Sequence, residues 1–185
     1  MEPLHIKTPL LTIRHLKPSD LDDFHLYRSN PEVTKYQGFD VMTLVQATEF
    51  ILENESKYYG NAGEWVQYGI EHNHSGKLVG DCAIKLDVLD PRIAEIGITI
   101  SHLEQRKGYA KETFISLLKF LFDTKDIHRV VEIVDTENIA SIELLKSISF
   151  RQEGHFIENI FFKGKWGSEY QYAMLKREWD KRNER

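Results

Sequence analysis

The strongest constraint on the fold lies between residues 93 and 124, where an apolar segment ends in a short cationic turn and a helix begins. The sequence IAEIGITI (93–100) predicts a strand, and the apolar positions from Lys107 to about Thr124 recur at helical spacing. The turn between them, QRKGYA (105–110), holds one glycine. The free N–H groups and the dipole of a helix N-terminus bind anions. The segment therefore indicates either a phosphate-binding turn or an ordinary glycine-containing turn with solvated cations.

The turn carries none of the established nucleotide fingerprints. It lacks the Lys-Ser/Thr pair of a P-loop and the three glycines of a dinucleotide-binding motif. Its cations are Arg106, Lys107 and Lys111. Taken alone, this stretch leaves both interpretations open.

Composition restricts the class of protein. The chain has 185 residues, 41% of them hydrophobic and 29% charged, which is typical of one globular domain. Its net charge of −5 argues against non-specific nucleic-acid binding, which needs a basic face. We expect a single domain over 1–185, with a core over about 8–179, a solvated charged C-terminal tail and no direct nucleic-acid partner.

The cysteine content and the N-terminus bear on location. Cys82 is the only cysteine, so no intrachain disulfide can form and a reducing compartment is expected. We interpret Cys82 as a packed side chain rather than a nucleophile, because it lies in the apolar run VGDCAIKL. The N-terminus lacks the pattern of a signal peptide, and no run approaches the roughly 18 apolar residues of a membrane span. We expect a cytoplasmic protein without membrane contact.

The rest of the chain alternates predicted strands and helices. This order favours a mixed α/β sheet. Strands are expected at 10–16, 65–72, 77–88, 93–100 and 129–134 and as a closing antiparallel pair within 150–175; helices are expected near 20–29, 43–58, 107–124 and 138–148.

A second motif, DTENIASIELLKSISF, follows the strand predicted at 129–134. Asn138 comes just after the strand and opens a helix, and Ser141 lies one turn further on the same side. The Asn138 side chain either caps the helix or donates to a ligand in the gap between two strand ends. Both interpretations stay open on the residues alone.

The two motifs together resemble the GNAT N-acetyltransferases, in which Gln/Arg-x-x-Gly-x-Ala opens one helix and Asn-x-x-Ser a later one. NPEVTKY (30–36), AEIGITI and FFKGKWGSEYQYAML resemble the RimJ/RimL branch, which acetylates protein N-terminal amines. The resemblance covers about residues 8 to 179. It implies a GNAT fold with a mixed, mostly antiparallel sheet of about seven strands, a splayed central strand pair and about four helices.

The resemblance implies acetyl-CoA as co-substrate and assigns residues to it. Ile98, Thr99 and Ile100 would present backbone groups to the pantetheine arm, and Asn138 would contact its end. Amides of the turn would hold the pyrophosphate. The cofactor-binding residues expected at the turn are Gln105, Arg106, Lys107, Gly108, Tyr109, Ala110 and Lys111.

The resemblance also suggests catalytic residues. Glu95 matches an acidic position near the acceptor amine and is our candidate general base; otherwise it is a strand residue in a surface ion pair. Ser141 would lie near the thioester sulfur and donate to the leaving thiolate, because the tyrosine common in the family is replaced by Leu145. His102 is a weaker candidate for the base.

The acceptor site is less constrained. Tyr36, Trp166 and Tyr170 are candidates to line it, although strand aromatics are more often core residues. We expect no metal, since His72 and His74 have no third ligand nearby.

The sequence thus predicts an acetyl-CoA-dependent N-acetyltransferase acting on a primary amine, foremost a protein N-terminal amine. A small amine (a polyamine, an amino acid or an aminoglycoside) is the alternative acceptor. A coenzyme A-binding module without catalysis is the alternative from another class. We expect a monomer or a homodimer.

Overall fold

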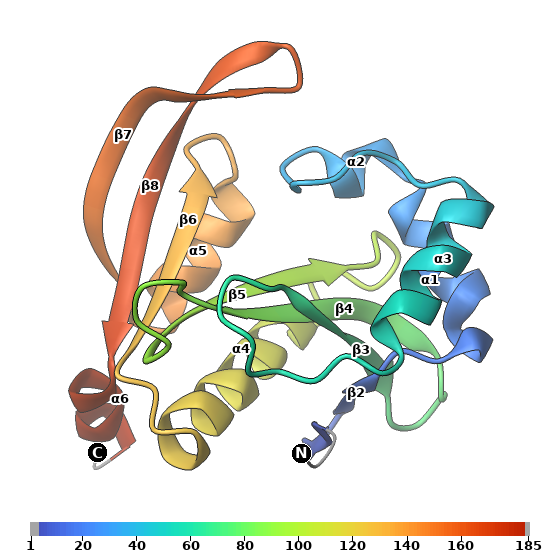
Figure 1. Cartoon of the computed structure of the whole chain (residues 1–185), viewed down its shortest axis with the longest axis horizontal. Coiled ribbons are helices and arrows are strands. Elements are labelled where there is room, and N and C mark those ends of the chain that lie inside the picture. Colours follow the sequence, from blue (N-terminus) through green and yellow to red (C-terminus); the bar gives the residue numbers. More distant parts are fainter. Residues whose placement is uncertain (1–3, 184–185) are drawn as a thin grey trace.

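The computed structural model describes residues 4–183, so both ends of the predicted 1–185 domain lie outside the described residues. Its framework is one eight-stranded sheet with the order β1-β2-β3-β4-β5-β6-β8-β7 (Figure 1). The strands are β1 Ile6–Lys7, β2 Leu11–His15, β3 Val66–His72, β4 Leu78–Leu86, β5 Ile93–Ile100, β6 Arg129–Asp135, β7 Arg151–Phe162 and β8 Lys165–Leu175.

The helices connect these strands and flank the sheet. They are α1 Leu21–Arg28, α2 Pro31–Thr34, α3 Leu44–Asn54, α4 Tyr109–Lys119, α5 Ile139–Ser147 and α6 Lys176–Asn183. A 3₁₀ turn, Pro18–Asp20, precedes α1, and a π turn, Phe120–Thr124, ends α4. The predicted α/β fold with a mostly antiparallel sheet is confirmed, with eight strands instead of about seven and six α-helices instead of about four within the described residues.

The sheet divides between β5 and β6, which form the only parallel pair among the described strands. They pair only at Ile93 with Arg129 and at Ala94 with Val130. Beyond these residues the strands diverge, and Figure 1 shows β5 and β4 running away from the upright β6, β8 and β7. This is the splayed central pair that the family resemblance implied.

The two faces of the sheet bury different helices. Phe114, Leu117 and Leu118 of α4 belong to the same buried cluster as Cys82 and Ile84 of β4. Because side chains alternate along a strand, Asp81 points to the opposite face, where it contacts α1. Helices α1 and α4 therefore cover opposite faces.

The C-terminal segment differs from the prediction of a solvated tail. It forms α6, and Trp179 is only 3% exposed. The indole ring lies 6.0 Å from the Phe122 ring, and its Nε1 donates to Asp123 at 2.9 Å. That part of the prediction was wrong, because the average polarity of the segment masked one large apolar anchor.

Short elements near the N-terminus were also missed. Strand β1 pairs with β2 ahead of the predicted start of the core at residue 8. Helix α2 begins with Pro31, and the Asn30 side chain caps it by accepting from the Glu32 amide at 2.9 Å. Both elements are shorter than a periodicity argument can detect.

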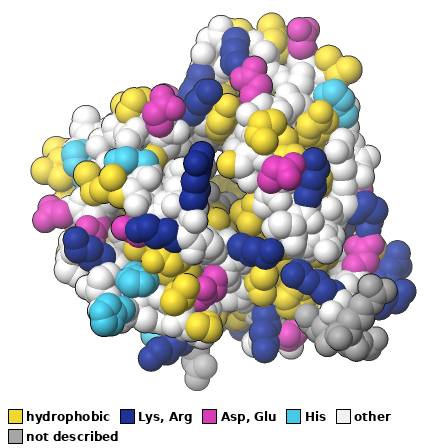
Figure 2. Space-filling model, turned by 180° about the vertical axis from the view of Figure 1, so that it is seen from behind, with side chains coloured by type: hydrophobic (Ala, Val, Ile, Leu, Met, Phe, Trp, Pro, Cys, Tyr) yellow, Lys and Arg dark blue, Asp and Glu magenta, His cyan; other side chains and the backbone are white. Residues whose placement is uncertain are grey.

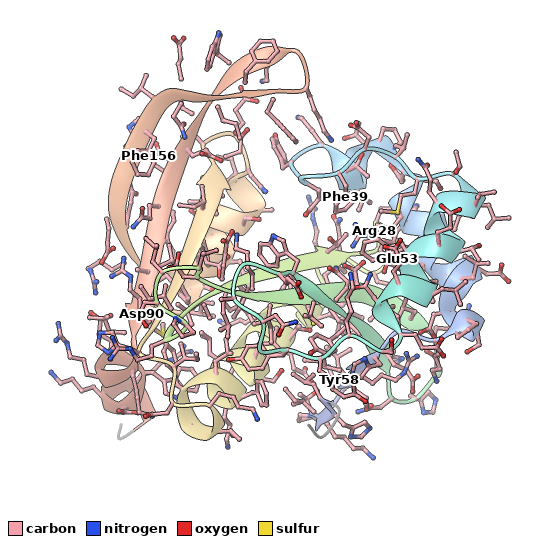
Figure 3. The ribbon with its side chains drawn as sticks, in the orientation of Figure 1. Arg28, Phe39, Glu53, Tyr58, Asp90 and Phe156 are labelled. Atoms are coloured by element: carbon pink, nitrogen blue, oxygen red, sulfur yellow. The ribbon has the colours of Figure 1, made fainter. Side chains whose placement is uncertain are left out.

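A buried ion pair fixes α1 to the sheet. Arg28 donates to Asp81 through Nη2 at 2.6 Å and Nε at 3.0 Å, and the Tyr27 hydroxyl donates to the same carboxylate at 2.6 Å. The Arg28 guanidinium lies 3.8 Å from the centre of the Phe39 ring, and Figure 3 shows the two residues together below α2. Burial raises the pKa of the Tyr27 hydroxyl, which therefore stays a donor.

Arg28→Met should lower the free energy of unfolding by about 3–5 kcal/mol, because it leaves the buried Asp81 charge without its partner. Urea denaturation measures this loss. The control is Lys146→Ala, which breaks the exposed pair with Glu143 and should cost under about 1 kcal/mol. Equal losses in the two variants would contradict the anchoring role of Arg28.

Candidate active site

A cavity of about 580 Å³ opens where β5 and β6 diverge. Its walls come from α2 and the residues just after it, the β5 edge, the turn before α4, the end of β6 and the first turns of α5. Figure 2 shows a hollow near the middle of the back face, with hydrophobic atoms on its floor and Lys and Arg side chains around it.

The β5 edge presents backbone groups to this cavity. The Ile96 N–H donates to Glu132 Oε1 at 3.0 Å, and the Ile98 and Ile100 carbonyls accept from Gln37 and Gln105 at 3.5 and 3.3 Å. The N–H and C=O of one strand residue point to the same side. The Ile98 N–H therefore points into the gap, where no described residue accepts from it.

The turn before α4 places free amides at the opposite wall. Gly108 is the N-cap residue with φ of +87°, and it has no side chain to accept from the first N–H groups of the helix. Arg106 also has a positive φ, of +62°. Lys107 forms an ion pair with Glu104 at 2.7 Å and does not line the cavity. The other predicted turn residues do line it: Gln105, Arg106, Gly108, Tyr109, Ala110 and Lys111.

Helix α5 completes the cavity. Asn138 Oδ1 accepts from the Ser141 amide at 3.2 Å, so the oxygen caps the helix. Asn138 Nδ2 remains as a donor. The same side chain can therefore cap α5 through its oxygen and donate to a ligand through its nitrogen. Asn138 and Ser141 line the cavity together with Ile98, Thr99 and Ile100. Leu145, where the family commonly has tyrosine, lines it as well.

Glu95, the predicted base, lies elsewhere. Its carboxylate forms an ion pair with Lys85 of β4 at 2.5 Å, and the Lys85 ammonium lies 4.5 Å from the centre of the Trp65 ring. Glu95 is not among the residues that line the cavity. The structure does not bring it together with Asn138 and Ser141, and its role stays a prediction.

A second carboxylate, Glu132 of β6, was missed by the sequence analysis. It is only 6% exposed and lines the cavity. Burial is the main cause that raises its pKa well above the usual range, and the Glu95 charge adds to this; the Ile96 N–H and Lys85 oppose it. One signal was present: in RVVEIV, Glu132 alternates onto the face of Val130 and Val134, both of which are buried.

The second cavity, of about 440 Å³, lies between α2 and the tip of the β7–β8 hairpin. It shares Tyr36 and Asp135 with the first cavity. Tyr36 therefore lies where the two cavities meet, and its role toward an acceptor stays a prediction. Trp166 is 60% exposed on the hairpin against Phe161, and Tyr170 packs against His155; neither lines either of these two cavities.

Three further features concern the cysteine, metal-ligating side chains and membrane-spanning helices. Cys82 is fully buried, and burial raises the pKa of its thiol, so it is the packed side chain that the sequence indicated. Among residues 4–183, no cluster of three or more His, Cys, Asp and Glu side chains is arranged to hold a metal ion. No helix in the described part of the chain is long and apolar enough to span a membrane.

The walls of the first cavity fit an elongated, phosphate-bearing thioester. Free amides at a helix N-terminus suit a pyrophosphate, and the open β5 edge suits the amide groups of a pantetheine arm. These features suit an acyltransferase site that uses an acyl-CoA.

Comparison with known proteins agrees with this class. The family described as Acetyltransferase (GNAT) domain matches residues 11–151. The uncharacterized N-acetyltransferase p20 of Bacillus licheniformis is 32% identical over 97% of this chain and 99% of its own length. The chain belongs to the GNAT family and is an acetyl-CoA-dependent N-acetyltransferase.

Solved structures share the fold. A GNAT-family acetyltransferase from Bacillus anthracis has a TM-score of 0.85 and 27% identity, over 94% of this chain and 99% of the other. Spermidine N-acetyltransferase from Vibrio cholerae, solved with CoA and spermine, has a TM-score of 0.77 and 21% identity, over 93% and 99% of the two chains. The latter similarity shows the fold alone.

Gly108→Val should weaken acetyl-CoA binding by about tenfold or more, because a branched side chain would stand beside the amides expected to hold the pyrophosphate.

Coenzyme A should also stabilise the wild-type protein. At a coenzyme A concentration of about 100 times its Kd, the free energy of unfolding should rise by roughly 2.7 kcal/mol, which a thermal-shift assay detects.

Gly76→Val is the matched control for this prediction. Gly76 has φ of +67° and, like Gly108, has open space where a Cβ would lie, but it sits in the β3–β4 turn. Both variants strain a left-handed backbone, whereas only Gly108→Val should lose cofactor affinity. An unchanged Kd for acetyl-CoA in Gly108→Val would contradict the assignment of the turn.

Proposed function

We propose that this enzyme transfers the acetyl group of acetyl-CoA to the N-terminal amine of a protein or peptide. The observation that carries the proposal is the second cavity, which meets the first at Tyr36 and Asp135. An acceptor lying in the second cavity would present its amine at this junction, beside the divergence of β5 and β6.

The charges of the second cavity are mixed. Lys165 pairs with Glu137 at 2.9 Å, and Lys163 lies 3.6 Å from Asp40. Asp135, at the junction, forms no ion pair with a described residue, although its charge and that of Lys165 interact; its carboxylate would attract the ammonium form of an amine. Apolar atoms of Pro31, Val41 and Phe162 complete the lining.

This lining favours a peptide over a polycation. A polyamine carries several positive charges and would be attracted most by walls of net negative charge. Here three lysines balance three carboxylates in number, and the apolar atoms offer contacts for an amino-acid side chain. The alternative acceptor remains a small amine, in line with the name of the Vibrio cholerae spermidine N-acetyltransferase.

The cofactor would lie along the first cavity as the family resemblance implies. The amides from Arg106 to Lys111 would hold the pyrophosphate, and the backbone from Ile98 to Ile100 the pantetheine arm. The Ile98 N–H and Asn138 Nδ2 are donors for carbonyl groups there. Holding the two substrates in line lowers the activation free energy by up to roughly 7–11 kcal/mol.

The surroundings and assembly of the enzyme belong to the same proposal. A reducing compartment such as the cytoplasm suits the lone Cys82 thiol. The enzyme would act as a monomer or a homodimer. A coenzyme A-binding module without activity is disfavoured, because Asn138 and Ser141 both line the cavity.

An amine panel tests the acceptor. Purified enzyme is given acetyl-CoA with short peptides that have free N-termini, with the same peptides blocked at the N-terminus, and with spermidine, free amino acids and an aminoglycoside, and thiol release is followed. We expect release with free-N-terminus peptides only. Faster thiol release with spermidine than with peptides would contradict the peptide acceptor and support the small-amine alternative.

Ser141→Ala should lower kcat while leaving the Kd for acetyl-CoA nearly unchanged, because the hydroxyl would donate only to the sulfur that becomes a thiolate. Stopped-flow thiol release and a binding titration measure the two quantities. Ser147→Ala on the same helix is the control, since its hydroxyl donates to the Leu144 carbonyl. A kcat loss no greater in Ser141→Ala than in Ser147→Ala would exclude this role.

A further inference from the structure

We infer that Glu132, rather than Glu95, takes the proton from the acceptor amine. The inference rests on the proposed acetyl transfer to an amine and concerns the same site. Glu132 is the carboxylate of the described residues that lies where β5 and β6 separate, with its side chain bonded to the open β5 edge. It lines the same cavity as Ile98, Asn138 and Ser141.

The two oxygens of Glu132 have different surroundings. Oε1 accepts from the Ile96 N–H at 3.0 Å, which fixes the carboxylate beside β5. Oε2 accepts no hydrogen bond from the described residues. Among residues 4–183, the fully buried side-chain atoms without a hydrogen-bond partner belong to His15 and Thr113. Oε2 is not one of them, so it keeps some exposure on the cavity wall. Oε2 is therefore a positioned and accessible proton acceptor.

The position of Glu132 also suits the reacting atoms. The Ile96 amide, which holds Oε1, is two residues before Ile98, whose free N–H is the donor for the thioester carbonyl. An amine attacking that carbonyl from the gap would approach Oε2. The Glu95 charge acts on Glu132, but the Glu95 carboxylate is engaged by Lys85 and does not line the cavity.

The electrostatics make Glu132 a stronger base than an exposed carboxylate. Burial and the Glu95 charge raise the pKa of Glu132, whereas Lys85 lowers it. A carboxylate with a raised pKa is a stronger base than an exposed one and accepts a proton more readily. The other charged groups on the cavity wall are Glu32, Glu104, Arg106, Lys111 and Asp135.

The reaction balances as follows. The ammonium form of the acceptor gives one proton to Glu132 Oε2, and the nitrogen lone pair forms a bond to the thioester carbonyl carbon. The carbon–sulfur bond then breaks, and its electron pair leaves on the sulfur. The nitrogen loses a second proton, which ends on the thiolate. The products are an amide and a thiol, and Glu132 returns its proton to water.

Glu132→Gln tests this assignment, because the amide oxygen can still accept from the Ile96 N–H while the base is lost. We expect kcat/KM to fall about 10²–10⁴-fold near neutral pH, with an unchanged Kd for coenzyme A. The wild-type kcat/KM should rise with pH as Glu132 ionises, and the variant should lack this rise. The loss should shrink at high pH, where the amine deprotonates without a base.

A stability measurement shows whether the variant folds. A raised pKa in the folded state means that the Glu132 side chain contributes full stability at low pH and loses it as pH rises between its unfolded and folded pKa values. The glutamine of Glu132→Gln does not ionise, so the variant has no such pH-dependent loss of stability. At neutral pH its Tm should be equal to or higher than that of wild type. A large fall in Tm would mean that the side chain is structural.

Glu95→Gln is the comparison variant. It should keep kcat/KM within about threefold of wild type and retain a rise with pH, which should move to lower pH because the Glu95 charge no longer raises the pKa of Glu132. The opposite result, a large loss in Glu95→Gln with Glu132→Gln near wild type, would overturn the inference and restore Glu95 as the base. If wild-type enzyme itself releases no thiol with any amine of the panel, the proposed function fails instead, and the two failures are distinct.

Discussion

The separation of β5 from β6 after only two paired residues is the constraint on which the rest of the structure depends. An unpaired strand edge inside a protein is costly unless other groups satisfy it. Here Gln37, Gln105 and Glu132 supply side-chain partners to parts of this edge. The Ile98 N–H is left for a ligand. The cavity is therefore a gap in the hydrogen bonding of the sheet that the fold keeps open, with α4 and α5 placed at its two ends.

Much of this arrangement could be predicted from sequence, because it depends on local signals. The 93–100 strand, the left-handed glycine at 108 and the capping asparagine at 138 each have a local cause in periodicity, backbone freedom or hydrogen bonding. The partners of charged residues could not be predicted in this way. The Lys85–Glu95 pair depends on the register of β4 and β5, and the role of Glu132 depends on the divergence of β5 and β6. Both are tertiary properties.

The two cavities share the α2 region as a wall and differ in their other walls. Apart from that region, the first is formed by β5, β6, the start of α4 and α5, and the second by the hairpin of β7 and β8 and by residues at the end of β6. Lys163 at the hairpin tip donates to the carbonyls of Thr34 and Phe39, at 2.6 and 3.1 Å. This side chain joins the hairpin to the α2 region, so the shape of the second cavity depends on two segments that are far apart in the sequence.

The buried Arg28–Asp81 pair has a consequence for how such enzymes diversify. It attaches α1, and through it the α2 region, to β4 by side chains alone, whereas the cofactor turn is continuous with β5. Substitutions within residues 21–60 that keep Arg28 leave this attachment to Asp81 intact, so the segment can vary without losing its place on the sheet. Because the α2 region lines both cavities, such variation would change the surroundings of both substrates proposed here.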